Sequence, residues 1–290
     1  MQQLREKMVR GTSDFPFATY RYFVQYPGYI TVDLHWHPEI EILFIKKGEI
    51  ATYVDEEKII LKEGDICFIN PEELHTIATH SQTVEYQAAV FVPSLLGFPS
   101  GHFFAENFIS PLTNCNIRFP RIISREHYLY EKILPMINLI LSFGASKPKI
   151  LANLTTLFCT FIDEDIMEPN PDNHHRRHHE DIKRCIEYMY EHYAQKITLT
   201  ELADLVHTSP NYFCSFFKEY TGISAFAQLN HIRIKKATTL LSKDDDSIAN
   251  IAKNCGFENM SYFIKKFKEI IGCTPSAYRK ALLNSDSNSQ

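Results

Sequence analysis

The second half of the sequence contains an internal repeat. The hexapeptide FKEYTG at residues 217–222 returns as FKEIIG at residues 267–272, and each copy ends a run with helical spacing of apolar residues. Each run follows a shorter helical run centred on a small residue, Ala203 in the first copy and Ala252 in the second. Repeated sequence is expected to form the same local structure twice. Two helices joined by a tight turn are typical of a helix-turn-helix, whose second helix enters the major groove of DNA.

Local signals mark where these helices begin and end. Thr198 and Glu201 have the spacing of a capping box. Ser209 followed by Pro210 is a typical helix start, and Gly222 is a typical stop. The first copy is therefore expected to be two separate helices.

The turn between the paired helices and the segment between the two copies add further constraints. The turn needs a residue that tolerates positive φ, which suits Gly256 in the second copy better than His207 in the first. Residues 224–242 form one helical pattern of 19 residues, about 28 Å long. Two recognition helices at that separation can reach successive major-groove faces about 34 Å apart. The alternative is a bundle whose repeat reflects packing alone, but solenoids stack three or more copies directly.

Each second helix has an apolar and a polar face when 100° is turned per residue. The buried faces are expected to be Phe213, Phe216, Phe217 and Tyr220 in the first copy and Phe263, Phe267, Ile270 and Ile271 in the second. The DNA-binding faces are expected to be Asn211, Cys214, Ser215 and Lys218 in the first copy and Ser261, Ile264, Lys265 and Lys268 in the second. An exposed isoleucine beside two lysines suits contact with a thymine methyl group.

Charge is divided unevenly along the chain. Residues 181–290 carry 14 Lys and Arg against 12 Asp and Glu, whereas residues 1–180 carry 16 against 23. This asymmetry fits an acidic domain joined to one that meets phosphate.

The first half of the chain changes from strand patterns to helix patterns. The segments 29–37, 39–48, 49–69 and 83–92 are rich in β-branched and aromatic residues separated by turn signals, which favours a sandwich or barrel. Residues 125–165 have helical spacing, with Pro135 expected at a start or a kink. Residues 167–180, MEPNPDNHHRRHHE, offer almost nothing to bury and are expected to be a polar linker.

Histidines and a glutamate are spaced within the strand region as in a binding site. His35 and His37 alternate on one face of a strand, and Glu41 and Gly48 complete the pattern H-x-H-x3-E-x6-G. A second stretch, GDICFINPEELH, ends at His75.

Residues 181–281 resemble the DNA-binding domain of the AraC/XylS family of transcriptional regulators. The resemblance rests on LTELADLVHTSPNYFCSFFKEYTG and on the patterns G-F-x-x-x-S-Y-F-x-x-x-F-K and P-x-x-Y-R in the second copy. It implies two helix-turn-helices in one monomer that bind one asymmetric double-stranded DNA site, usually to activate transcription beside RNA polymerase. Ser215 stands where the family often has a basic residue, and His207 where glycine is common.

The histidine patterns resemble the two-part motif of the cupin barrel, in the form typical of sensor domains in the same family. The resemblance implies that a small-molecule effector, often a sugar, binds inside the barrel, where His35, His37, Glu41 and His75 would contact it. In metal cupins the matching four residues bind one ion, and three imidazoles with a carboxylate suit iron, manganese, nickel or zinc. Sensor cupins of this family generally bind effectors without a metal. Glu72-Glu73 also departs from the usual Pro-x-Gly turn of the metal form, so no cofactor is predicted.

The helical segment 125–166 resembles the dimerisation segment of the same family. Its density of large apolar side chains exceeds the needs of one packing face, so a homodimer is expected, with Leu154 and Leu157 in the contact.

Together these features predict a multidomain α+β protein. An N-terminal antiparallel β-barrel of the cupin type with its dimerisation segment is expected in residues 1–166, a linker in 167–180, an all-α double helix-turn-helix in 181–284 and a disordered tail in 285–290. No stretch approaches the roughly 18 apolar residues of a membrane span, and no secretory signal is evident, so a cytoplasmic protein is expected. The predicted function is effector-controlled DNA binding without enzymatic activity. The alternative is a cupin metalloenzyme with a helical accessory domain.

Overall fold

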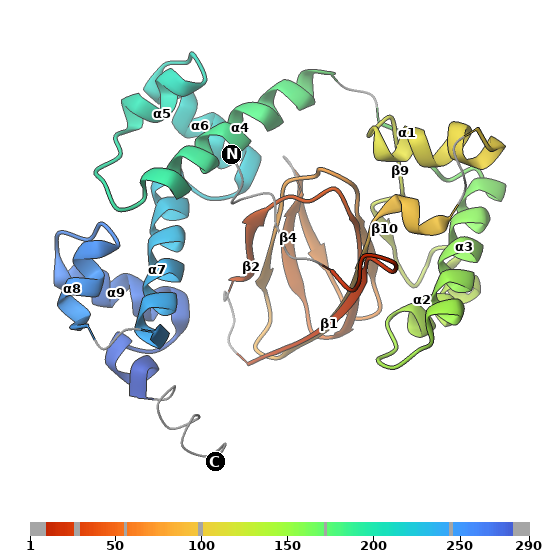
Figure 1. Cartoon of the computed structure of the whole chain (residues 1–290), viewed down its shortest axis with the longest axis horizontal. Helices are drawn as coiled ribbons and strands as arrows, with labels where there is room; N and C mark the ends of the chain where they lie inside the picture. The colour runs from red at the N-terminus through yellow and green to blue at the C-terminus, as the bar shows by residue number, and fades with distance from the viewer. Residues whose placement is uncertain are drawn as a thin grey trace. The chain divides into compact units, whose positions relative to one another are not determined.

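The computed structural model describes residues 10–25, 30–54, 57–97, 101–170, 173–243 and 246–280 (Figure 1). The chain forms two compact units that divide between Arg176 and Arg177. The expected tail, 285–290, lies outside the described residues.

The N-terminal unit is built on two antiparallel sheets. The first has the order β1-β8-β3-β6-β10 and comprises Phe17–Val24, Val84–Phe91, Ile40–Lys47, Ile66–Ile69 and Ile122–Ile123. The second has the order β2-β7-β4-β5 and comprises Ile30–His35, His75–Thr79, Ile50–Val54 and Glu57–Leu61. The antiparallel strand-rich domain predicted from the sequence is therefore present. Strands β1, β7 and β10 lie outside the four segments named from the sequence.

Strand β3 is buried on both faces, which explains its nearly continuous apolar sequence. Leu43 and Ile45 pack with residues of the second sheet, such as Ile50 and Ile77. The alternate residues of β3 pack into a separate core with helices α2 (Tyr130–Ile140) and α3 (Lys147–Asp163). Because successive side chains of a strand point to opposite faces, Glu41 lies on the same face as Leu43, toward the second sheet.

Several short elements connect the sheets and helices of this unit. They are η1 (Pro93–Leu96), η2 (Ala105–Ile109), α1 (Ser110–Thr113), β9 (Ile117–Arg118) and β11 (Glu168–Pro169). Strands β9 and β11 pair with each other, and Arg118 forms an ion pair with Glu168 at 2.8 Å.

The structure corrects the expected role of two leucines in α3. Leu154 and Leu157 are each only 2% exposed and belong to the core between the helices and the first sheet. The expectation that they form a dimer contact is therefore wrong, because α2 and α3 bury their large apolar side chains against the sheet of their own chain. Pro135 lies inside α2, five positions after its first residue, Tyr130, so it does not mark the start of the helix.

The segment predicted as a linker, 167–180, also differs from the expectation. It contains β11, and helix α4 begins at Asn173 and continues to His192. A helix can start there because residues 173–192 contain neither proline nor glycine.

The C-terminal unit contains the two predicted helix pairs. The first pair is α5 (Leu199–Leu205) and α6 (Pro210–Thr221), and the second is α8 (Ile248–Asn254) and α9 (Met260–Ile271). Helix α7 (Ala225–Lys243) joins the pairs and contributes Ile234 and Leu241 to the core of the second pair. Among the described residues, no helix is both long enough and apolar enough to cross a membrane.

The local signals in the sequence act as predicted. Thr198 and Glu201 form the capping box, Ser209 caps α6, and Gly222 ends α6 in the left-handed conformation. His207 adopts the positive φ that the first turn requires.

Candidate ligand pocket and nucleic-acid interface

The four residues predicted to form a pocket come together in the N-terminal unit. His35 ends β2 and is paired in register with His75, the first residue of β7. Glu41 belongs to β3, and His37 lies in the bend between β2 and β3. One ligand atom from each of the four lies within 4.8 Å of the others.

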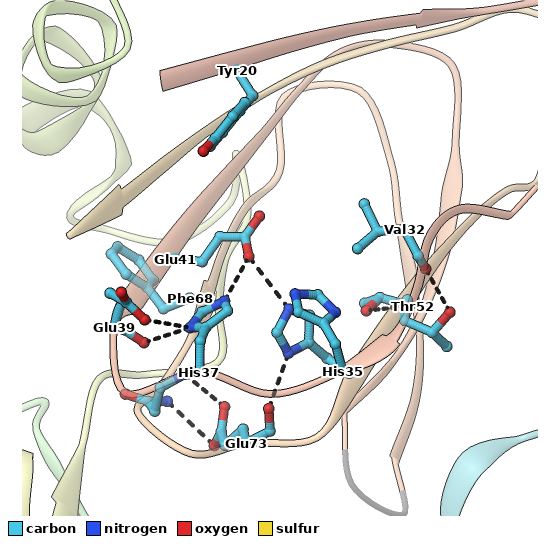
Figure 2. A network of polar contacts seen from close by, with 12 residues as sticks. Tyr20, Val32, His35, His37, Glu39, Glu41, Thr52, Phe68 and Glu73 are labelled. Atoms are coloured by element: carbon cyan, nitrogen blue, oxygen red, sulfur yellow. Dashed lines mark hydrogen bonds and ion pairs between the residues drawn. The ribbon is translucent and has the colours of Figure 1, made fainter. Parts of the chain in front are cut away.

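Glu41 is the centre of this cluster. Its Oε2 lies 3.3 Å from Nε2 of His37 and 3.3 Å from Nε2 of His75, as Figure 2 shows for His37. His75, His37 and Glu41 are 0%, 1% and 6% exposed. The ring centroids of His35 and His75 are 4.2 Å apart. His35 is partly exposed as a whole residue.

All three imidazoles are held by the backbone through the same ring nitrogen. Nδ1 of His35 lies 2.8 Å from the carbonyl of Asp33, and Nδ1 of His37 lies 3.1 Å from that of Glu39. Nδ1 of His75 lies 3.0 Å from the Glu73 carbonyl. A carbonyl oxygen only accepts hydrogen bonds, so Nδ1 donates in each case. The other nitrogen of each ring, Nε2, is then the one available for binding.

Electrostatics keeps Glu41 ionised and His35 neutral. Burial alone would raise the pKa of the Glu41 carboxyl, but hydrogen bonding to His37 and His75 and the charges of both rings outweigh it. The pKa therefore lies well below its ordinary value. The pKa of His35 also lies well below its ordinary value, because of burial first and the neighbouring rings of His75 and His37 second.

The turn before His75 is held by a network that the sequence did not reveal. Glu73 accepts a hydrogen bond from the backbone N–H of Asn70 at 2.7 Å and binds the guanidinium of Arg121 through both of its oxygens. The side chain of Asn70 accepts a hydrogen bond from the N–H of Phe119 at 2.7 Å. Glu72, which precedes Glu73, adopts a positive φ of 65°. Only Arg121 and Phe119 lie far from the motif, and no spacing in the sequence links them to it.

Arg10 is a second residue that the sequence analysis missed. It is 7% exposed, its Nε lies 3.9 Å from the carboxylate of Glu39, and its Nη1 donates to Tyr20 at 3.3 Å. Glu39 in turn lies 3.7 Å from Nδ1 of His37. Arg10 thus supports the bend that carries His37.

The expected DNA-binding faces are exposed on α6 and α9. All eight predicted residues are exposed: Asn211, Cys214, Ser215, Lys218, Ser261, Ile264, Lys265 and Lys268. The opposite faces have Phe213, Phe217, Phe263 and Phe267 at 0% exposure. Ile270 and Ile271, also expected on the buried face, are only partly buried against the same core. Tyr212 and Tyr262 are also exposed, at 53% and 44%. They occupy equivalent positions in the first turns of the two helices and were not among the predicted contacts.

Comparison with known protein families assigns both halves of the chain. Residues 16–98 match the AraC-like ligand-binding domain, and residues 202–281 match a helix-turn-helix domain. The chain belongs to the AraC family of transcriptional regulators. The first matched region contains all four residues of the His–Glu cluster, and the second contains all eight predicted DNA-binding residues of α6 and α9.

Individual relatives agree with the AraC assignment. The HTH-type transcriptional regulator YdeC of Bacillus subtilis is 25% identical over 305 residues, which cover 96% of this chain and 97% of YdeC. Regulatory protein PocR of Salmonella typhimurium is 39% identical over 105 residues, 36% of this chain and 35% of PocR. The HTH-type transcriptional activator RhaS of Escherichia fergusonii is 22% identical, covering 85% of this chain and 87% of RhaS.

This AraC-family chain is thus a transcriptional regulator with a DNA-binding helix-turn-helix domain and a ligand-binding domain. The relatives are transcriptional regulators rather than enzymes. They favour the regulator over the cupin metalloenzyme that the sequence left as the alternative.

Proposed function

We propose that a small polar effector binds at His35, His37, Glu41 and His75 and thereby controls the binding of α6 and α9 to promoter DNA. The observation that carries this proposal is the convergence of three imidazoles and one carboxylate within the matched ligand-binding domain. Buried polar groups of this kind bind a ligand that can form hydrogen bonds with them. A sugar, with hydroxyl groups that both donate and accept, is the effector class we propose. The sensor occupies residues 1–166 and the DNA-binding part residues 181–284.

The DNA contacts in this proposal come from the exposed faces of α6 and α9. Lys218, Lys265 and Lys268 supply positive charge for phosphate or guanine contacts. Ile264, 37% exposed, is placed to contact a thymine methyl group. Asn211, Cys214, Ser215 and Ser261 complete the two faces. The proposal includes action in the cytoplasm beside RNA polymerase. It also includes activation of transcription, which the name of the relative RhaS, a transcriptional activator, supports.

A homodimer is also part of the proposal, with a contact surface different from the one first expected. The side of α3 that flanks its buried face carries Leu151, Thr155 and Cys159, all partly exposed. A symmetric contact through this stripe would bury it and place two DNA-binding units side by side.

The test has two parts that use the full chain. Binding sites are selected from random duplex DNA, and affinity is measured by fluorescence anisotropy. A panel of monosaccharides is then screened for compounds that raise the melting temperature and change DNA affinity. His37→Ala should remove the response to the compound and keep DNA binding. If no DNA sequence is enriched, the proposed DNA contacts are wrong; if a compound acts equally on wild type and His37→Ala, the proposed pocket is wrong.

A further inference from the structure

We propose that Arg233 fixes the orientation of the two helix pairs relative to each other. It thereby sets the spacing between the two blocks of DNA sequence that α6 and α9 bind. The inference rests on the proposed DNA contacts of these two helices. Its starting point is the position of Arg233 near the middle of α7, the helix that joins the two pairs (Figure 1).

The first helix pair forms one body with α4. On α4, Nη1 of Arg184 donates to the carbonyl of Leu205 at 3.1 Å, and the thiol of Cys185 donates to the carbonyl of Leu202 at 3.6 Å. Both carbonyls belong to α5. Helix α4 and the first pair therefore hold a fixed position relative to each other.

The second helix pair forms another body with the C-terminal half of α7. Ile234, Ala237 and Leu241 of α7 pack in one core with residues of α8 and α9, among them Ile251 and Phe263. This half of α7 is therefore fixed relative to the second pair.

The side chain of Arg233 joins the two bodies. Its Nε donates to the carbonyl of Tyr193 and its Nη2 to the carbonyl of Gln195, both at 2.8 Å, in the segment that connects α4 to α5. The guanidinium carbon of Arg233 lies 5.7 Å from the centre of the Phe257 ring. A Cβ atom at Gly256 would lie 3.0 Å from both Nε and Nη2. The guanidinium thus lies against the turn of the second pair while it binds the segment that leads into the first.

A guanidinium is suited to this junction because it is planar and its N–H groups point in fixed directions. Two of its donors bind two carbonyls along one edge, and its charge lies near an aromatic ring. Lysine carries the same charge, but all its donors are on one nitrogen at the end of a flexible chain. Arg233→Lys should therefore keep the charge and lose the fixed geometry.

A cavity beside Arg233 leaves room for the two bodies to shift. Its volume is about 860 Å³, and its walls come from residues 194–197 before the first pair and from Phe257, Met260 and Tyr262 of the second. Side chains that fill a space hold its walls apart at one distance. Because this space is open, packing there does not replace the hydrogen bonds of Arg233.

The orientation of the two pairs matters because DNA is a helix. One extra base pair between the two blocks moves the second block by about 3.4 Å along the duplex and turns it by about 35°. A rigid arrangement of α6 and α9 therefore fits one spacing, whereas a loose arrangement accepts several.

The experiment measures this spacing preference with the full chain. Selection from random duplex DNA gives the bound sequence, and the block bound by α9 is the one at which Lys265→Ala relaxes specificity. Duplexes are then made with one or two base pairs added or removed between the blocks, and one duplex keeps the α9 block alone. Fluorescence anisotropy measures the affinity for each.

The wild type should lose at least about tenfold in affinity when one base pair is added or removed, and Arg233→Lys should lose less than about threefold. Both proteins should bind the duplex with the α9 block alone equally, because the exposed face of α9 is unchanged. A purely stabilising role of Arg233 would instead weaken binding by the same factor at every spacing.

Arg184→Lys is the matched control, because it removes an arginine–carbonyl bond inside the first body. It should keep the spacing preference of the wild type. The proposal is overturned if wild type and Arg233→Lys lose the same factor at each changed spacing, if the wild type accepts every spacing, or if Arg184→Lys relaxes the preference equally. A selection that enriches no sequence would overturn the proposed DNA contacts as well. Circular dichroism identifies a variant that fails to fold, and Arg233→Gln then takes the place of Arg233→Lys.

Discussion

His207 and Gly256 hold the same position in the two helix-turn-helix turns, with φ of 55° and 82°. Both backbones are left-handed, although only one of the residues is glycine. At Gly256 a Cβ atom would lie 2.5 Å from the carbonyl oxygen of Tyr193, which also accepts a hydrogen bond from Arg233. The second turn therefore requires glycine for space as well as for conformation.

Opposite effects on stability are expected from substitutions at these two positions. Gly256→Ala should lower the free energy of unfolding by about 2 kcal/mol or more, because left-handed strain adds to the clash. His207→Gly should raise it by at most about 1 kcal/mol, since the strain relieved exceeds the entropy that glycine adds to the unfolded chain. Urea unfolding of the full chain measures both, and equal stability of Gly256→Ala and wild type would contradict the account of the turn.

Lys265 and Lys268 are expected to contribute to DNA binding in different ways. The Lys265 side chain is 71% exposed in the middle of the α9 face, within reach of base edges. Lys265→Ala should therefore cost roughly 1–3 kcal/mol at one base pair and relax specificity there. Lys268, in the last turn of α9, should contact phosphate. Lys268→Ala should weaken binding to all sequences. It should also lower the slope of log affinity against log salt concentration by about one.

Lys266→Ala is the matched control for both lysines. Its side chain is 30% exposed and forms an ion pair with Glu269 at 2.7 Å, so it should change DNA affinity little. Anisotropy titrations on matched and mismatched duplexes at several salt concentrations distinguish the three variants. If Lys265→Ala loses the same affinity for the matched and the mismatched duplex, Lys265 does not contact a base.

Glu201 should make the stability of the first helix pair depend on pH. The backbone hydrogen bond from Thr198, at 2.6 Å, and the side-chain bond from its hydroxyl lower the pKa of Glu201 below 4.5. The stabilisation is therefore present above pH 4.5 and is lost as pH falls through the lower folded value. Glu201→Ala should lower the free energy of unfolding at neutral pH. The difference in this free energy between Glu201→Ala and wild type should shrink in acid.

Thr198→Ala should cost about 1 kcal/mol at neutral pH through loss of the cap. Glu219→Ala, at an exposed position on α6, is the control. If the free energies of unfolding of Glu201→Ala and wild type differ by the same amount from neutral to acid pH, the capping carboxylate is not the cause of that difference.

Substitutions at two positions on α3 should distinguish a residue of the dimer contact from a residue of the core. Leu151→Glu, at a partly exposed position, should give a folded monomer. Leu154→Glu, at a position 2% exposed, should destabilise the chain by at least about 3 kcal/mol. Sedimentation measures association and circular dichroism measures folding. A wild-type chain that is already monomeric at micromolar concentration would contradict the proposed dimer.

The sequence by itself determined the two helix pairs of the C-terminal half. Its helices are bounded by Thr198, Ser209 and Gly222, and its buried and exposed faces follow from a spacing of three to four residues. These signals are local, because caps and helical periodicity act over a single turn. The repeat adds a second copy of the same information fifty residues later, and so the two helix pairs were predictable.

Only the tertiary structure decided how the N-terminal half uses its residues. The motifs named His35, His37, Glu41 and His75, but the pairing of β2 with β7 sets their distances, and Arg121 reaches Glu73 across 48 positions. Leu154 and Leu157 were assigned to the wrong contact, because an apolar stripe on a helix has the same pattern whether a sheet or a second chain covers it. Long-range packing makes that choice, and it leaves no periodic signal in the sequence.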